Sequence, residues 1–341
     1  MVHWLREGAG RPREAAEAVR GGRGERGMRV CWVRRNRPIA PVPYIHSEAG
    51  LPVGQKALVF LAHSDDGRYI GCSLSLMNRM GAHGPRNDIA IIVVASGYRS
   101  VDGDLPKEEK AEVRRREALR WAEILGYRVE QVLCFGAEET YEARRGILPH
   151  DQERMNRLIA AREPTMVFVP HLSDTAQHIN FYTRKMVMKA VTLWMTEEYA
   201  LGRPDRDVIV MEYPTNHVPI LPPSDKNFII AFTDPEMAAL KHEANKAHES
   251  QDAKGFDVMQ QFVEAIDALR DSDDVFQTSR AGRRFSRYLS DIRPNARQSR
   301  GEHFGVTRLV IRRRDDRSPV IVEERLKFPL AAENRTRWGY E

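Results

Sequence analysis

The chain has 341 residues, of which 42% are hydrophobic, so it is long enough to bury the core of one large domain or two modest ones. No apolar run reaches the roughly 18 residues that a membrane span needs, so we expect a soluble protein without a membrane span. The formal net charge is +5, but residues 1–37 contain ten arginines and four glutamates, and the remainder is close to neutral. This distribution argues against a nucleic-acid partner.

Three cysteines, Cys31, Cys72 and Cys134, are too few and too far apart for a disulfide framework, which predicts a reducing, cytoplasmic location. The N-terminal segment is rich in Arg and Gly, and it lacks the continuous apolar stretch of a secretory signal. The sequence PIAPVPY (38–44) then has the proline content of a stiff linker. We therefore predict a flexible extension and linker over 1–54, a folded domain over 55–315 and a C-terminal tail over 316–341.

From residue 55 onward, segments typical of strands alternate with segments typical of helices. Short, continuously apolar runs indicate strands that are buried on both faces, and longer amphipathic runs indicate helices. Their alternation predicts a mostly parallel, doubly wound α/β sheet. The predicted strands are 56–63, 88–97, 129–136, 165–171, 207–214 and 227–234, and the predicted helices are 108–126, ended by Gly126, 151–162 and 180–199.

A histidine and two adjacent acids, in the sequence HSDDG, directly follow the first predicted strand. In doubly wound sheets the site lies outside the C-terminal ends of the strands, and His171 stands at the end of the fourth strand. Adjacent carboxylates are costly to bury unless a cation holds them. His63 and Asp66 are spaced to bind one divalent ion in a turn, with Asp65 beside it as a general base. The alternative is that the two acids cap a helix that begins near Gly71.

The sequence AHSDDGRYIGCSL (62–74) resembles the first motif of the PIG-L/LmbE-type N-acetylglucosaminide deacetylases, which reads A-H-P-D-D-E before a Gly-rich turn into a helix. The resemblance implies a Rossmann-like fold with a single catalytic domain. It also implies a zinc-dependent hydrolase that removes an acetyl group from an N-acetylated amino sugar or related glycoconjugate. Further motifs follow in the family's order over residues 56–310: RRREALRWAEILG (114–126), PHLSDTAQHINFYTRKMVMKA (170–190), KAHESQ (246–251) and GEHF (301–304).

The same resemblance implies roles for individual residues. His63, Asp66 and His178 match the ligands of one Zn²⁺ per chain, and Asp65 matches the general base. The expected partner is a small N-acetyl sugar, with a homo-oligomer as a further possibility. Weaker candidates for substrate contact or for support of the site are Arg99, His171, Asp174, His248, Gln251 and Glu302.

The sequence departs from the family pattern in three places. Ser64 and Gly67 replace the proline and glutamate of the first motif, and ASGYRS (95–100) replaces a T-x-G-E segment. Thr175 replaces a histidine three residues before the third ligand, which leaves two alternatives: His171, Asp174 or His248 supplies the function of that histidine, or the reaction runs with a weaker acid. Two other classes therefore stay open: a non-catalytic carbohydrate-binding or scaffold member of the fold, and a nucleotide-binding α/β protein. The chain has no G-x-G-x-x-G after the first strand, which argues against the nucleotide.

Overall fold

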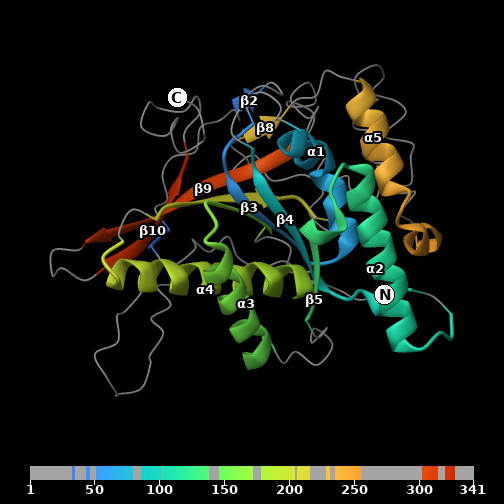
Figure 1. Ribbon diagram of the computed structural model, residues 1–341, viewed down its shortest axis with the longest axis horizontal. Coiled ribbons are helices and arrows are strands. Elements are labelled where there is room, and N and C mark those ends of the chain that lie inside the picture. The colour runs from blue at the N-terminus through green and yellow to red at the C-terminus, as the bar shows by residue number, and fades with distance from the viewer. Residues whose placement is uncertain are drawn as a thin grey trace, which may run out of the picture.

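The computed structural model of the protein describes residues 33–34, 44–46, 51–79, 86–101, 103–137, 146–171, 178–203, 206–215, 228–230, 235–254, 302–313 and 319–326. Within these residues a mostly parallel sheet carries helices on both faces (Figure 1), which confirms the predicted doubly wound α/β fold. The strands are β1 (Val33–Arg34), β2 (Tyr44–His46), β3 (Lys56–Leu61), β4 (Asp88–Ala95), β5 (Val132–Ala137), β6 (Met166–Pro170), β7 (Val208–Tyr213), β8 (Phe228–Ile230), β9 (Glu302–Arg313) and β10 (Pro319–Arg325). The α-helices are α1 (Gly71–Arg79), α2 (Lys107–Ile124), α3 (Pro149–Arg162), α4 (His178–Ala200) and α5 (Pro235–Asn245), and the short 3₁₀ helices are η2 (Ser64–Tyr69), η4 (Tyr98–Ser100), η5 (Val129–Gln131) and η7 (Glu249–Lys254).

The central strands are all parallel and lie in the order β7-β6-β3-β4-β5. From β3 the chain passes to β4 and β5 on one side, and it then returns to β6 and β7 on the other side. The direction of winding therefore reverses between β3 and β6. In open α/β sheets this reversal leaves a crevice at the C-terminal ends of the two strands, where ligands bind. His63 follows β3 and His171 follows β6, so both stand at this crevice.

Strand β3 shows how the sheet buries both of its faces. Val59 and Leu61 pack in a core with residues of α1 and α2, whereas Leu58 and Phe60 pack in a second core with residues of α3 and α4. Successive strand residues point to opposite faces, so a strand covered on both sides must be apolar at every position. This requirement explains why the apolar runs predicted the strands, and Figure 1 shows α3 and α4 on one side of the sheet and α1 and α2 on the other.

Most predicted elements form close to their expected bounds. Helix α2 ends at Ile124, and Gly126 follows with φ +91°, a left-handed conformation that glycine adopts without strain and that ends a helix. Helix α3 begins earlier than predicted, with Pro149 in its first turn, where the missing N–H of proline costs nothing. Strand β5 begins later than predicted because residues 129–131 form η5. Of the predicted strand 227–234, β8 covers 228–230, and the rest lies outside the described residues.

Strand β10 lies within the segment that the sequence indicated as a C-terminal tail. It pairs antiparallel with β9 along its whole length, and its Val320, Ile321 and Val322 are buried. Charged residues surround this short apolar run in the sequence, and they obscured its strand pattern. Strands β1 and β2 likewise form within the expected extension and pair in parallel with β10 and β8. The folded sheet therefore reaches beyond the predicted limits 55 and 315.

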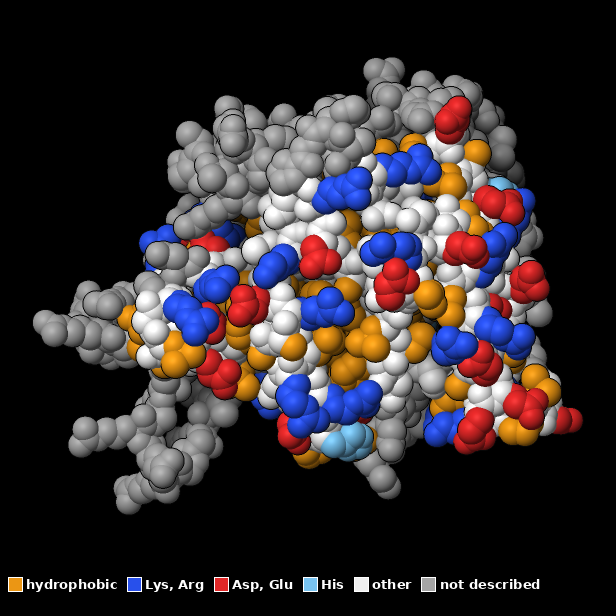
Figure 2. Space-filling view, viewed as in Figure 1, with side chains coloured by type: hydrophobic (Ala, Val, Ile, Leu, Met, Phe, Trp, Pro, Cys, Tyr) orange, Lys and Arg blue, Asp and Glu red, His pale blue; other side chains and the backbone are white. Residues whose placement is uncertain are grey.

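The visible surface carries charges of both signs. On the face shown in Figure 2, Lys and Arg side chains are interspersed with Asp and Glu side chains, and hydrophobic side chains lie between them. No helix among the described residues combines the length and the apolar character that crossing a membrane requires.

Glu302 of β9 closes the N-terminal end of α1. Its carboxylate accepts hydrogen bonds from the amide N–H groups of Cys72 (2.9 Å) and Ser73 (2.8 Å), and it forms an ion pair with Lys241 Nζ at 2.6 Å. The first N–H groups of a helix have no partner within the helix, and a carboxylate there also interacts favourably with the helix dipole. Glu302 of β9 therefore acts as the N-terminal cap of α1, the helix that follows the HSDDG turn.

We predict that Glu302→Ala lowers the free energy of unfolding by about 2–3 kcal/mol, because it leaves two buried N–H groups and a lysine without their acceptor. Urea denaturation measures this effect. The matched control is Glu123→Ala, which removes an exposed glutamate paired with Arg120 and should cost at most about 1 kcal/mol. Equal losses in the two variants would contradict the capping role.

Candidate active site

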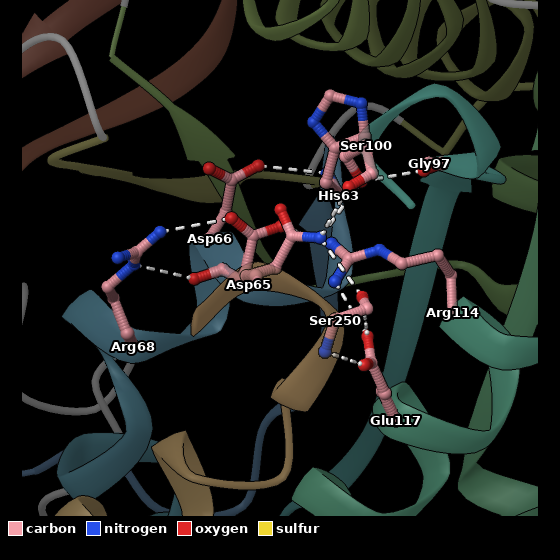
Figure 3. A network of polar contacts seen from close by, with 10 residues as sticks. His63, Asp65, Asp66, Arg68, Gly97, Ser100, Arg114, Glu117 and Ser250 are labelled. Atoms are coloured by element: carbon pink, nitrogen blue, oxygen red, sulfur yellow. Dashed lines mark hydrogen bonds and ion pairs between the residues drawn. The ribbon is translucent and has the colours of Figure 1, made fainter. Parts of the chain in front are cut away.

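The turn from His63 to Arg68 follows the C-terminal end of β3 and carries the central residues of the candidate site (Figure 3). The amide N–H of His63 donates to Asp66 Oδ2 (2.9 Å), and the amide N–H of Asp66 donates to the carbonyl oxygen of His63 (3.2 Å). These reciprocal bonds fix the Asp66 carboxylate at the start of the turn. The Asp66 side chain is buried, and His63 is partly exposed. An imidazole and a carboxylate thus occupy one rigid turn.

Asp65 stands in a different environment from its neighbour, because two arginines hold its carboxylate. Arg114 Nη2 contacts Oδ1 at 2.5 Å, and Arg68 Nη2 contacts Oδ2 at 3.0 Å. Burial alone would raise the pKa of the carboxyl, but Arg114 and Arg68, helped by His63 and His248, hold the pKa of Asp65 well below its usual range. Asp65 is therefore ionised near neutral pH, although it is buried.

Arg114 connects Asp65 to a wider network of buried polar groups. Its Nη1 donates to Glu117 Oε2 (2.7 Å), one helical turn further along α2. Glu117 in turn accepts from the amide N–H of Ser250 (2.7 Å, on Oε1) and from Ser250 Oγ (3.0 Å, on Oε2). Gln251 Nε2 donates to the carbonyl oxygen and to Oγ of Ser100, both at 3.2 Å. The network therefore joins η2, α2, η4 and η7 around the turn (Figure 3).

Trp121 of α2 packs directly against the turn at Gly67. A Cβ atom on Gly67 would lie 2.3 Å from Trp121 Cζ2, a distance that no side chain tolerates. The same indole lies beside the imidazole of His248, with ring centroids 6.4 Å apart and planes tilted by 31°. The space next to residue 67 is thus filled from α2, which explains why glycine stands where the family motif has glutamate.

His248 is fully buried beside the charged network. Burial has the largest effect on the pKa of His248 and lowers it. The charges of Arg114 and Arg68 lower the pKa further, whereas the charge of Asp65 raises it, and the resulting pKa is about 3. The imidazole is therefore neutral near pH 7. The sequence indicated support near the site for His248, and the structure places it against Trp121 and within the electrostatic field of Asp65.

Arg99 lies in the loop after β4, and Gly97 of this loop approaches the same turn. Gly97 has φ +67°, and a Cβ atom there would lie 2.9 Å from Arg114 Nε and 3.6 Å from His63 Cδ2, so this loop runs against both residues. Arg99 follows two residues later and donates from Nε to the hydroxyl of Tyr98 (2.9 Å). The structure thus places Arg99 two residues after the glycine that approaches His63, with its guanidinium against the ring of Tyr98.

His171 belongs to a second buried group. Its Nε2 lies 3.7 Å from Glu212 Oε2, and Glu212 also forms an ion pair with Arg184 of α4. This group sits between β6, β7 and α4. Asp174 and Thr175 lie outside the described residues.

His178 is the first residue of α4, and its side chain is not among those described. The next residue, Ile179, packs in a buried cluster with Ala62 and Ala95. Since Ala62 directly precedes His63, the start of α4 lies against the end of β3. Among the described side chains, which exclude that of His178, no group of three or more His, Cys, Asp or Glu is arranged to hold a metal ion.

Sequence reasoning did not identify Arg68, Arg114, Glu117 and Ser250 as parts of the site. A signal for two of them was present in α2, because Arg114 and Glu117 lie on the same helix face as the buried Trp121. Charged residues on the apolar face of a helix are rare unless they are paired, so their position indicates a buried ionic contact.

Comparison with known families finds a match over the segment that contains this site. Residues 58–191 match the PIG-L family, described as GlcNAc-PI de-N-acetylase. This segment contains the HSDDG turn, the Arg114–Glu117 pair and the start of α4. The resemblance to the PIG-L/LmbE-type family that the sequence motifs indicated is therefore confirmed over this segment. Comparison with curated proteins gave no match.

Among solved structures, the chain is similar to N,N′-diacetylchitobiose deacetylase from Pyrococcus horikoshii, with 18% identity over 74% of this chain and 84% of that chain and a TM-score of 0.49. It is similar to GalB, the 4-carboxy-2-hydroxymuconate hydratase from Pseudomonas putida KT2440, with 16% identity over 76% and 98% and a TM-score of 0.44. A deacetylase of teicoplanin biosynthesis shares 15% identity over 74% and 98%, with a TM-score of 0.44.

We predict that Gly67→Ala lowers the free energy of unfolding by about 1–3 kcal/mol, because the new methyl group overlaps the rigid indole of Trp121. Gly71→Ala is the matched control, since a Cβ there would meet its nearest atom at an ordinary 3.6 Å. Denaturant unfolding of the two variants gives the comparison. If Gly67→Ala costs no more than Gly71→Ala, the close contact between the turn and α2 is wrong.

We predict that His248 makes the protein lose stability in acid. An unfolded histidine binds a proton below about pH 6.5, whereas folded His248 stays neutral down to about pH 3. Stability associated with His248 is therefore present above pH 6.5 and is lost as the pH falls toward 3, by about 1.4 kcal/mol per pH unit. The free energy of unfolding of chelator-treated protein, measured from pH 6 to 4, should depend less steeply on pH in His248→Gln. Parallel curves for parent and variant would contradict this.

Proposed function

We propose that the protein is a metal-dependent amidohydrolase that removes the acetyl group from an N-acetylated amino sugar or related glycoconjugate. The observation that carries this proposal is the separation of two adjacent acids at the crevice between β3 and β6. Arginines hold Asp65, whereas Asp66 is fixed beside His63 in the turn. The match of residues 58–191 to the PIG-L family supports the N-acetyl sugar as the substrate class.

In this proposal His63, Asp66 and His178 hold one Zn²⁺. Imidazole and carboxylate are donors that zinc prefers, and three protein ligands leave one position open for reaction. The packing of Ile179 against Ala62 supports the set, because it brings the start of α4 to the end of β3. The buried charges also fit a bound cation, because the site contains more carboxylates than guanidinium groups. The three carboxylates are those of Asp65, Asp66 and Glu117, and the two guanidinium groups are those of Arg68 and Arg114.

When bound, such an ion supplies Lewis-acid polarisation of the amide carbonyl and a lowered pKa of water. Asp65 accepts a proton from the attacking water, whose oxygen bonds to the carbonyl carbon. A carboxylate has about four acceptor positions, of which Arg68 and Arg114 each use one. The C–N bond then breaks, the proton passes from Asp65 to the departing nitrogen, and acetate and a free amine result.

The two arginines set the properties of Asp65 in this scheme. Because they hold its pKa well below the usual range, Asp65 is charged before the reaction and releases its proton readily afterwards. Asp65 thus serves as both base and donor, a role that does not depend on the histidine that Thr175 replaces. His171 contacts Glu212 instead, so we do not assign the proton donor to it.

The test pairs metal analysis with a screen for amine release from N-acetylated sugars. We expect about one zinc per chain in the parent, and loss of both metal and activity in Asp66→Ala and His178→Ala. Asp65→Asn should retain the metal but lower the rate by about 10²–10⁴, since an amide cannot accept the proton. Asp151→Asn, in α3 beside Arg154, is the matched control and should keep both properties.

Three outcomes would contradict the ligand assignment, the general base or the enzymatic activity. A His178→Ala variant that binds as much metal as the parent would remove the ligand assignment. Parent-like turnover by Asp65→Asn would remove the general base. Full metal occupancy without amine release from any N-acetyl sugar would identify a non-catalytic binding protein of the same fold.

A further inference from the structure

Glu117 links Arg114 to Ser250, and both of its carboxylate oxygens accept hydrogen bonds. Oε2 accepts from Arg114 Nη1 (2.7 Å) and Ser250 Oγ (3.0 Å), while Oε1 accepts from the amide N–H of Ser250 (2.7 Å). The side chain is buried. The carboxylate does not contact the turn of His63 and Asp66 in these bonds, so its influence on the reaction passes through Arg114 and Ser250.

The guanidinium of Arg114 lies between two carboxylates. Nη1 points to Glu117, and Nη2 points to Asp65. A guanidinium is planar and its donors have a fixed fork geometry, so a bond that fixes Nη1 also fixes the direction of Nη2. The orientation of the Asp65 carboxylate therefore depends on a residue in the next turn of α2.

We infer that Glu117 is a positioning residue for Asp65: it holds Arg114 in place and fastens η7 to the site. The kinetic part of this inference rests on the proposed amidohydrolase function. Two hydrogen bonds attach η7 to the site: Ser250 donates to Glu117, and Gln251 donates to Ser100. Ser100 Oγ in turn donates to the carbonyl oxygen of Gly97 (2.7 Å), the residue that runs against His63. Figure 3 shows both routes meeting at the turn.

A simpler role for Glu117 would be to stabilise α2 through an ion pair of i, i+3 spacing. The helix contains two other pairs of this spacing, Glu112 with Arg115 and Arg120 with Glu123, and both are exposed. Exposed pairs contribute little to stability. The pair of Arg114 and Glu117 differs because it is buried and because each member has a partner outside the helix. This difference allows the two roles to be separated.

The variant Glu117→Gln separates the two attachments. Gln presents one oxygen and one NH₂ group, so it can accept from Ser250 N–H with Oε1 and donate to Ser250 Oγ with Nε2. That NH₂ group then faces Arg114 Nη1, and two donors cannot bond to each other. Glu117→Gln therefore releases Arg114 and keeps η7 in place. Glu112→Gln removes the exposed pair on the same helix and serves as the matched control.

Steady-state kinetics at full zinc occupancy give the first measurement. We expect Glu117→Gln to lower kcat by about 10- to 10²-fold, because a catalytic group displaced by about 1 Å loses this much rate. KM and metal content should stay near those of the parent, and Glu112→Gln should match the parent in all three. A kcat for Glu117→Gln within about twofold of the parent, or a loss equal to that of Glu112→Gln, would overturn the inference.

Hydrogen exchange gives a second measurement that needs no substrate. The amides of Asp66 and Ile70 are bonded within the turn, to His63 and Gly67. They should exchange faster in Glu117→Gln than in Glu112→Gln, while the amide of Ser250 stays protected. If the parent releases no amine from any N-acetyl sugar, the proposed function fails and exchange alone decides. Parent-like protection of Asp66 and Ile70 in Glu117→Gln would then overturn the positioning role.

Discussion

The buried contact between Asp65 and Arg114 is the interaction on which the rest of the site depends. Removing one partner of a buried ion pair costs about 3–5 kcal/mol, because the other charge is left without compensation. Asp65 can occupy its place after β3 only because α2 supplies a guanidinium there. That guanidinium in turn needs Glu117, and Glu117 needs the N–H and hydroxyl donors of Ser250. Three chain segments, η2, α2 and η7, are thus joined by one series of ion pairs and hydrogen bonds.

This arrangement gives the two adjacent acids separate tasks in one turn. The charge of Asp65 is compensated by protein groups, so it stays ionised inside the molecule. Asp66 is oriented by the backbone of His63 and adds a further carboxylate to the same buried turn. A protein that buries more carboxylates than guanidinium groups at this position favours a cation beside them. Packing against α2 also fixes the position of the turn, because Trp121 fills the space beside Gly67 and leaves no room for a side chain there.

The sequence predicted those parts of the fold that local patterns determine. Apolar runs located β3, β4 and β6 because both sheet faces are covered, and Gly126 marked the end of α2 because it adopts a positive φ. His63, at the end of a buried strand, predicted the position of the site. The contact between Asp65 and Arg114 was not predictable in this way, since the two residues are 49 positions apart in the sequence. Packing brings such residues together, and no pattern along the chain records which charged residue of α2 faces inward.

Ser250 illustrates the same limit more strongly, because it lies 133 residues from Glu117 and is one of many small polar residues in the chain. The charge-rich sequence around β10 likewise concealed a strand that pairs with β9. In both cases long-range contacts override local composition. The resemblance to the family located the segments of Glu117 and Ser250 through RRREALRWAEILG (114–126) and KAHESQ (246–251), and their hydrogen bonds give the physical reason why they lie together.

The most direct test of this account is anomalous diffraction at the zinc absorption edge from crystals of the zinc-loaded protein. The account predicts a single strong peak between the imidazole of His63, the carboxylate of Asp66 and the imidazole of His178, with Asp65 still bound to Arg68 and Arg114 beside it. A peak at another position, or an ion bound by Asp65 in place of Asp66, would contradict it.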